Sequence, residues 1–223
     1  MSTRSKQLSL LRVNQKNDDE LSIKMGKIIA VTGTTGVGKT TLVRALCKQG
    51  LFITGLEQHV ERPFQQEFKA QREYALPNQI DFLLLRAEQE QFLRQSVHTG
   101  LMDGGLDVDF YGFTHLFRAR GLLTIAEYSL CQRFYKFVRT YLPPPDLIIH
   151  LTARPEVIDH RLARRKRINI AEPKDVLKLA AFLEDWLTAI PSNHIIRLEV
   201  SENDPGYHRL LPSLLLKIRP YIN

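Results

Sequence analysis

The chain has 223 residues, of which 43% are hydrophobic and 25% charged, a balance typical of one folded globular domain with a substantial core. No apolar run is long enough to span a bilayer, and two cysteines, Cys47 and Cys131, are too few for a disulfide framework. The net charge of +7 raises nucleic-acid binding as an alternative, but much of the excess lies in one cluster, Arg161 to Arg167, without interleaved aromatic residues. We therefore expect a cytoplasmic protein whose partners are small molecules, not nucleic acids or membranes. A homodimer is an open alternative to a monomer.

Residues 1–24 are polar and mixed in charge, apart from a short apolar patch at Leu8, Leu10 and Leu11. They predict a flexible tail, and the folded domain is expected over residues 25–223. The short apolar run Ile28–Val31 then predicts the first buried strand of this domain.

Directly after this run, residues 33–40 read Gly-Thr-Thr-Gly-Val-Gly-Lys-Thr and match the phosphate-binding pattern G-x-x-x-x-G-K-[ST]. The glycines let backbone N–H groups approach phosphates, and the helix that follows adds its positive N-terminal dipole. Lys39 is expected to reach the β- and γ-phosphates, and the Thr40 hydroxyl to coordinate Mg²⁺. The motif predicts a nucleotide site formed by Gly33, Thr34, Thr35, Gly36, Val37, Gly38, Lys39, Thr40 and Thr41.

Downstream, short apolar runs alternate with segments that have helical spacing. Further strands are expected at Leu51–Leu56, Leu101–Met102, Leu147–Leu151 and His194–Leu198. Helices are expected at Ile80–Phe92, Thr124–Leu142 and Pro155–Arg164. This alternation predicts an α/β protein with the P-loop NTPase fold, in which a five-stranded parallel sheet carries helices on both faces.

The segment Ile29–Leu42, which contains the phosphate motif, resembles the opening of the deoxyribonucleoside kinase family, in particular its bacterial deoxyguanosine and deoxyadenosine kinases. Weaker similarities follow in the family's order as far as about residue 200, among them Pro145–Val157. The resemblance implies ATP as donor, Mg²⁺ as its counterion and a basic lid that closes over the phosphates. It also implies an enzyme that phosphorylates the 5′-hydroxyl of a deoxynucleoside or a similar nucleoside.

The resemblance also implies roles for individual residues. Glu57 lies where the family carries its general base, and a carboxylate there can accept the proton of a sugar hydroxyl. Asp103 matches the acidic residue of the family's (D/E)-R-S motif and is expected beside Thr40 at the metal. The residues expected to bind the nucleobase are Gln79, Arg86, Asp109 and Phe113, the last by stacking.

The basic cluster has the spacing of the family's lid arginines, Arg161, Arg165 and Arg167. We expect Arg165 and Arg167 to contact ATP when the lid closes. The residues expected to act in catalysis are Lys39, Glu57, Arg161 and Arg165.

The sequence departs from the family at three places near the acceptor. Gly104 and Gly105 follow Asp103 where the family has arginine and serine, and that arginine holds the acceptor end of the substrate. Ile170 stands where some members have a glutamate, and Phe68 where some have a tyrosine. These departures predict weak turnover of ordinary deoxynucleosides and leave the preferred acceptor open.

Several alternatives remain at this point. A nucleoside monophosphate kinase would need a cationic site for a second phosphate, to which Arg62 or Arg72 could contribute. A non-catalytic nucleotide sensor would explain the missing arginine, whereas a GTPase is disfavoured because the guanine-binding motif N-K-x-D is absent from the sequence. Glu57 could be an ordinary solvated carboxylate, and Arg86 with Asp109 a surface ion pair beside a core Phe113.

Overall fold

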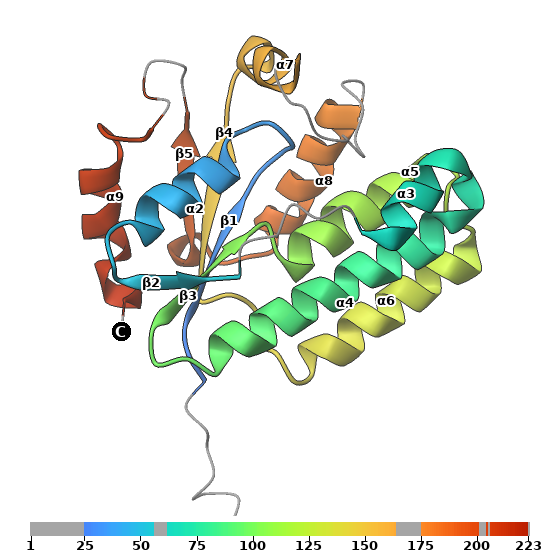
Figure 1. The fold of residues 1–223 in the computed structure, drawn as a ribbon, viewed down its shortest axis with the longest axis horizontal. Helices are drawn as coiled ribbons and strands as arrows, with labels where there is room; N and C mark the ends of the chain where they lie inside the picture. Colours follow the sequence, from blue (N-terminus) through green and yellow to red (C-terminus); the bar gives the residue numbers. More distant parts are fainter. Residues whose placement is uncertain (1–24, 56–61, 164–174, 201–203, 205, 223) are drawn as a thin grey trace, which may run out of the picture.

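The computed structural model describes residues 25–55, 62–163, 175–200, 204 and 206–222 (Figure 1). The expected tail, the general base Glu57 and the lid residues Arg165 and Arg167 lie outside these described residues. Five parallel strands form one sheet in the order β2-β3-β1-β4-β5, which confirms the predicted architecture. The strands are β1 (Ile28–Thr32), β2 (Phe52–Thr54), β3 (Thr99–Asp103), β4 (Leu147–Thr152) and β5 (Ile195–Glu199).

Helices cover both faces of the sheet, because neighbouring strand residues point to opposite sides. On one face, Ile149 packs in a cluster with Leu42 of α2 (Lys39–Cys47) and Leu214 of α9 (Leu211–Ile218). On the other face, Ile148 packs with Leu183 of α8 (Val176–Thr188). The buried strands β1 and β3 therefore contribute apolar side chains to two separate cores.

The helices agree with the sequence pattern in type and differ at their ends. The predicted helix 80–92 is α4, and it begins five residues earlier because Pro77 fits within a first helical turn. The predicted helix 124–142 is α6, whose start is fixed by a reciprocal capping box between Thr124 and Glu127. The α-helices are α2 (Lys39–Cys47), α3 (Pro63–Ala70), α4 (Ala75–Arg94), α5 (His115–Ala119), α6 (Ile125–Arg139), α7 (Pro155–Ala163), α8 (Val176–Thr188) and α9 (Leu211–Ile218).

Shorter helical segments connect these elements. Within the described residues these are the 3₁₀ helices η1 (Arg72–Tyr74), η4 (Ser192–His194) and η5 (Arg219–Tyr221) and the π-helix η2 (Val108–Thr114). The segment η2 is a π-helix, a conformation that is rare and often occurs at functional sites. Four residues separate it from the end of β3, and it is covered by α4, α6 and α8.

A buried ionic network joins α4, α6 and the start of η2. Arg139 of α6 donates to both Asp107 and Glu90, at 2.6 and 3.0 Å. Arg94 also donates to Glu90, at 3.1 Å, and to the backbone carbonyls of Pro143 and Gly26. Two arginines thus balance two acids, so the network holds η2 in place without leaving an isolated buried charge.

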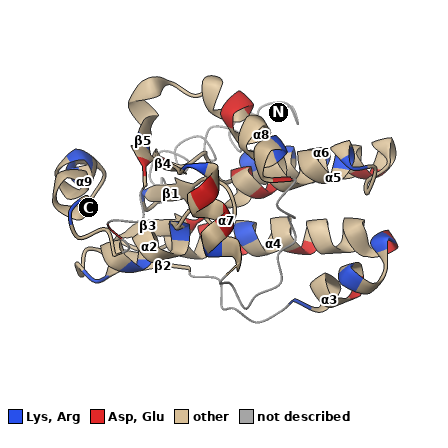
Figure 2. Ribbon diagram, turned by 90° about the horizontal axis from the view of Figure 1, so that it is seen from above, with Lys and Arg blue, Asp and Glu red and all other residues tan. Residues whose placement is uncertain are grey.

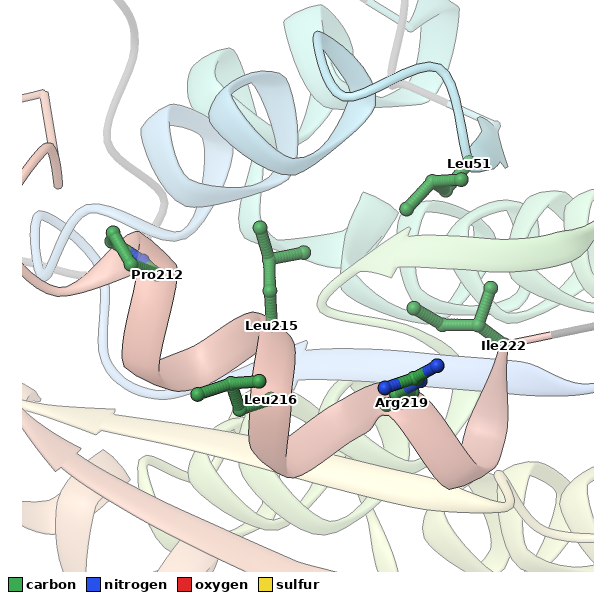
Figure 3. Close-up of a pocket in the computed structure, with 6 residues that line it drawn as sticks. All are labelled: Leu51, Pro212, Leu215, Leu216, Arg219 and Ile222. Atoms are coloured by element: carbon green, nitrogen blue, oxygen red, sulfur yellow. The ribbon is translucent and has the colours of Figure 1, made fainter.

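An apolar hollow of about 450 Å³ lies between α9 and the residue before β2 (Figure 3). Its lining residues are Leu51, Pro212, Leu215, Leu216, Arg219 and Ile222. Leu51 immediately precedes β2, so part of the lining lies at the amino end of that strand. In the part of the chain that the structure describes, no helix has the length and apolar character needed to cross a membrane.

Candidate active site

The phosphate loop connects β1 to α2 at the carboxyl edge of the sheet, where ligands bind in open parallel sheets (Figure 1). Gly33 and Gly38 have φ angles of 133° and 114°. A Cβ at Gly33 would lie 2.4 Å from the Leu151 carbonyl oxygen, and one at Gly38 would lie 2.2 Å from the Tyr207 hydroxyl. Glycine is therefore required at both positions. Among the described residues no side chain caps the N-terminus of α2 at Gly38, so its first N–H groups can bind an anion.

The motif's lysine and threonine both point back into this region. Lys39 Nζ donates to the carbonyl oxygens of Gly33 and Thr34, each at 3.0 Å. The Thr40 hydroxyl donates to the carboxylate of Asp103, the last residue of β3. The predicted metal residues Thr40 and Asp103 are thus in contact, and hydroxyl and carboxylate oxygens are the ligand types that Mg²⁺ prefers. The donor set fits that ion.

Two further side chains hydrogen-bond to backbone carbonyls of the phosphate loop. Arg161 of α7 donates from Nη1 to the Val37 carbonyl at 2.6 Å, so this predicted catalytic residue lies at the phosphate loop. The Tyr207 hydroxyl donates to the Gly38 carbonyl at 3.2 Å. Burial raises the pKa of Tyr207, which keeps the hydroxyl protonated and able to donate. The sequence analysis missed Tyr207, since no motif surrounds it.

A buried histidine contacts the residue that precedes the phosphate loop. Thr32, the last residue of β1, contacts His150 Nδ1 through its hydroxyl at 3.0 Å. The other ring nitrogen of His150 lies 3.3 Å from a carboxylate oxygen of Glu184. Burial lowers the pKa of His150, although the neighbouring Glu184 opposes this effect. The neutral imidazole can bond both neighbours at once.

The residues predicted to bind the nucleobase meet between α4 and η2. Arg86 Nε donates to Asp109 at 2.9 Å, and only 7% and 9% of the two side chains are exposed. The alternative of a surface ion pair is therefore wrong. Gln79 Nε2 donates to the Asp109 carbonyl at 2.9 Å and to the Thr114 hydroxyl at 2.8 Å. Thr114, which the sequence analysis missed, thus helps to fix Gln79.

Phe113 lies on η2 four residues after Asp109 and is half-buried against the cluster beneath α8. Phe68 of α3 packs against Phe117 with ring centroids 5.1 Å apart, so it belongs to the core around α4 and α6. The structure therefore brings Gln79, Arg86 and Asp109 into direct contact, with Phe113 on the same segment.

The two glycines after β3 shape the connection between the halves of the site. Gly104 and Gly105 have φ angles of 85° and 119°, and the Gly105 carbonyl accepts the backbone N–H of Asp109 at 3.1 Å. A Cβ built at Gly104 would lie 3.8 Å from Arg86 Nη2. The glycines thus make a tight turn that an arginine at Gly104 would strain, so their role is conformational.

Charged residues of both signs occur along the helices around the sheet. Viewed from above, Lys and Arg residues occur beside Asp and Glu residues on α3, α4, α6 and α8 (Figure 2). Of the basic cluster at 161–167, the structure describes the first three residues.

Comparison with known proteins places this site in a family. The family model for deoxynucleoside kinases matches residues 29–205. The chain is 32% identical over 143 residues to a deoxyadenosine kinase of Dictyostelium discoideum, an alignment that covers 64% of this chain and 58% of that enzyme. It is 26% identical over 190 residues to a deoxyadenosine/deoxycytidine kinase of Bacillus subtilis (strain 168), covering 83% of this chain and 88% of the relative.

A solved structure is similar over most of the fold. It is a deoxyadenosine kinase from M. mycoides with the products dCMP and dCDP bound. Its TM-score is 0.70 at 20% identity, covering 86% of this chain and all of that one, which supports the fold. Together the comparisons confirm the predicted resemblance and the predicted enzyme class, a nucleoside kinase, and they do not favour a monophosphate kinase or a non-catalytic sensor. The chain belongs to the deoxynucleoside kinase family.

Proposed function

We propose that the protein transfers the γ-phosphoryl group of ATP to the 5′-hydroxyl of a deoxynucleoside. The observation that carries the proposal is the direct connection between the phosphate loop and the buried base-binding residues. Thr40 contacts Asp103, the next residue is Gly104, and Gly104 lies beside the Arg86–Asp109 pair. A triphosphate and a nucleobase bound at the two ends of this connection would meet at the carboxyl edge of the sheet. Phosphoryl transfer depends mainly on such positioning and on charge neutralisation.

On the donor side, Lys39 and Arg161 neutralise charge on the phosphates, and the predicted lid arginines Arg165 and Arg167 add to this when the lid closes. Bound Mg²⁺ supplies charge neutralisation at the phosphate oxygens. The Thr40 hydroxyl would hold the ion, and Asp103 orients that hydroxyl by accepting its proton in a hydrogen bond.

On the acceptor side, Glu57 accepts the proton of the 5′-hydroxyl as the hydroxyl oxygen attacks phosphorus. Gln79, Arg86 and Asp109 hydrogen-bond the edge of the base, and Phe113 stacks on its face. We propose deoxyadenosine as the preferred acceptor, because the named relatives are deoxyadenosine kinases and a deoxyadenosine/deoxycytidine kinase.

The test is acceptor-dependent release of ADP, measured with the four common deoxynucleosides and with dAMP as a monophosphate acceptor. Release with deoxyadenosine and not with dAMP supports the proposal. A Lys39→Ala variant should lose at least about a hundredfold in turnover, since it removes a charge contact in the site. Near-normal turnover in a folded Lys39→Ala protein would contradict the assignment of the site.

We also propose that the protein is a cytoplasmic homodimer joined through α4 and α6. Both helices expose large apolar side chains, Phe92 on α4 and Leu130 and Phe137 on α6, and Tyr141 is exposed just after α6. The exposed charges differ in sign, with Glu88 on α4 and Arg133 and Lys136 on α6. A two-fold axis could therefore set α4 of one protomer against α6 of the other. Sedimentation of the wild type and of Phe137→Glu tests this: a dimer that the substitution does not weaken would exclude this surface.

A further inference from the structure

Asn78 is buried without hydrogen-bond partners. Its side chain is 1% exposed, and neither its amide nitrogen nor its oxygen has a partner within the described residues. Other buried polar side chains nearby, such as Gln79 and Arg86, are hydrogen-bonded. Among the residues that the structure describes, Asn78 is the one buried side chain left in this condition. A buried amide without partners costs stability, which an apolar residue of similar size would avoid.

The position of Asn78 on α4 places it beside the acceptor-binding residues. Successive residues of a helix are turned by about 100°, so Gln79 lies to one side of Asn78 and shares a stripe with Arg86. Asp81, three residues after Asn78, is displaced from it by about 60° in the other direction around the helix, and it pairs with Arg62 at the start of α3. Asn78 therefore lies between the base-binding stripe of α4 and the point at which α3 begins.

We propose that Asn78 hydrogen-bonds the nucleobase of the acceptor and helps to select its class. This inference rests on the proposed kinase function. A carboxamide offers one acceptor and a two-proton donor, which together match an amino group next to a ring nitrogen, as in adenine. The Asn78 oxygen accepts from the 6-amino group, and its amide nitrogen donates to the neighbouring ring nitrogen. Asn78 then supplies both a donor and an acceptor to an amino-bearing base, and Gln79, whose amide nitrogen is bonded to Asp109 and Thr114, adds its side-chain oxygen.

Asn78 thus lowers the stability of the fold and raises the affinity for the base, and the two effects can be measured separately. Asn78→Leu keeps the approximate size and removes both polar atoms. We expect its melting temperature to equal or exceed that of the wild type. We also expect kcat/KM for deoxyadenosine to fall by about 10- to 100-fold, with KM for ATP unchanged. The matched control is Asn193→Leu on the exposed turn η4, whose kcat/KM should not change.

The decisive measurement is the ratio of kcat/KM for deoxyadenosine to that for purine 2′-deoxyriboside, which lacks the 6-amino group. This ratio does not depend on the fraction of enzyme that is folded. It should favour deoxyadenosine in the wild type and fall by about tenfold in Asn78→Leu. An unchanged ratio overturns the assignment, and a lower melting temperature would then identify Asn78 as a structural residue bonded to internal water. If the wild type phosphorylates no deoxynucleoside, the kinase proposal fails, and calorimetric binding of the same two nucleosides decides the role of Asn78.

Discussion

Gly38 is the residue of the phosphate loop at which structure and binding can be tested together. Its φ of 114° is unfavourable for any residue with a Cβ, at a cost of about 1–3 kcal/mol. A Cβ there would also lie 2.2 Å from the Tyr207 hydroxyl and 3.4 Å from Arg161 Nη1. The tyrosine must move, and it then loses its hydrogen bond to the Gly38 carbonyl, a further loss of about 1 kcal/mol. Gly38→Ala should therefore lower the free energy of unfolding by about 2–4 kcal/mol.

Gly50→Ala is the matched control. Gly50 has a φ of 74°, and no atom of the described residues lies within 4 Å of an added Cβ, so its substitution costs backbone strain alone, about 1 kcal/mol. Tyr207→Phe completes the test, because it removes the clashing oxygen and leaves the ring carbon Cζ 3.5 Å from the new Cβ, an ordinary contact. The loss caused by Gly38→Ala should then be smaller by about 1–2 kcal/mol in the Tyr207→Phe background.

Urea unfolding of the four variants and the wild type measures these differences, and calorimetry measures ATP affinity. ATP affinity should fall in Gly38→Ala and not in Gly50→Ala. Equal losses of stability at Gly38 and Gly50, or no coupling between Gly38 and Tyr207, would refute the view that Tyr207 packs on the loop.

Three further predictions concern the chemistry and its pH dependence. Glu57→Gln should lower kcat by roughly 10²–10⁴-fold with KM for ATP little changed, because the amide cannot accept a proton. An unchanged kcat would exclude Glu57 as the general base and make Asp103 the next carboxylate to test. Arg165→Ala and Arg167→Ala should reduce turnover if the lid contacts phosphates, whereas salt-sensitive DNA binding lost in these variants at full turnover would indicate a nucleic-acid surface. Burial holds the pKa of His150 below that of an unfolded histidine, so the unfolded chain binds this proton first and stability falls as the pH drops through about 6.5. His150→Gln should reduce the loss of melting temperature between pH 7.5 and pH 5.5, and the same loss in both proteins would contradict this.

The sequence predicted the parts of the structure that depend on local pattern. The apolar runs gave the strands, and the glycine motif placed Lys39 and Thr40, because these features rest on burial and backbone conformation that short segments determine. The ends of α4 were less predictable, since Pro77 is compatible with a first turn and with a break. The roles of Glu57, Arg165 and Arg167 stay predictions.

Other features depend on contacts between distant segments, and the sequence carried no local signal for them. The π conformation of η2 has no hydrophobic period of its own, and it is held by packing from three helices. Tyr207 reaches Gly38 across 169 residues of sequence. Gly104 and Gly105 take positive φ angles in the turn after β3, which the sequence did not indicate, and the effect of the missing arginine on the acceptor stays a prediction.

The hydrogen bonds of Gln79 have a consequence for how the base preference of this enzyme can change. Its amide nitrogen is shared between the Asp109 carbonyl and the Thr114 hydroxyl, which lie at the two ends of one π turn. Any substitution at Gln79 therefore releases the turn that presents Asp109 to Arg86. The side chain of the neighbouring Asn78 has no hydrogen-bond partner within the described structure. A substitution at Asn78 therefore breaks no hydrogen bond of the fold and carries no such penalty. Divergence of acceptor choice should accordingly proceed through position 78 while position 79 stays constant.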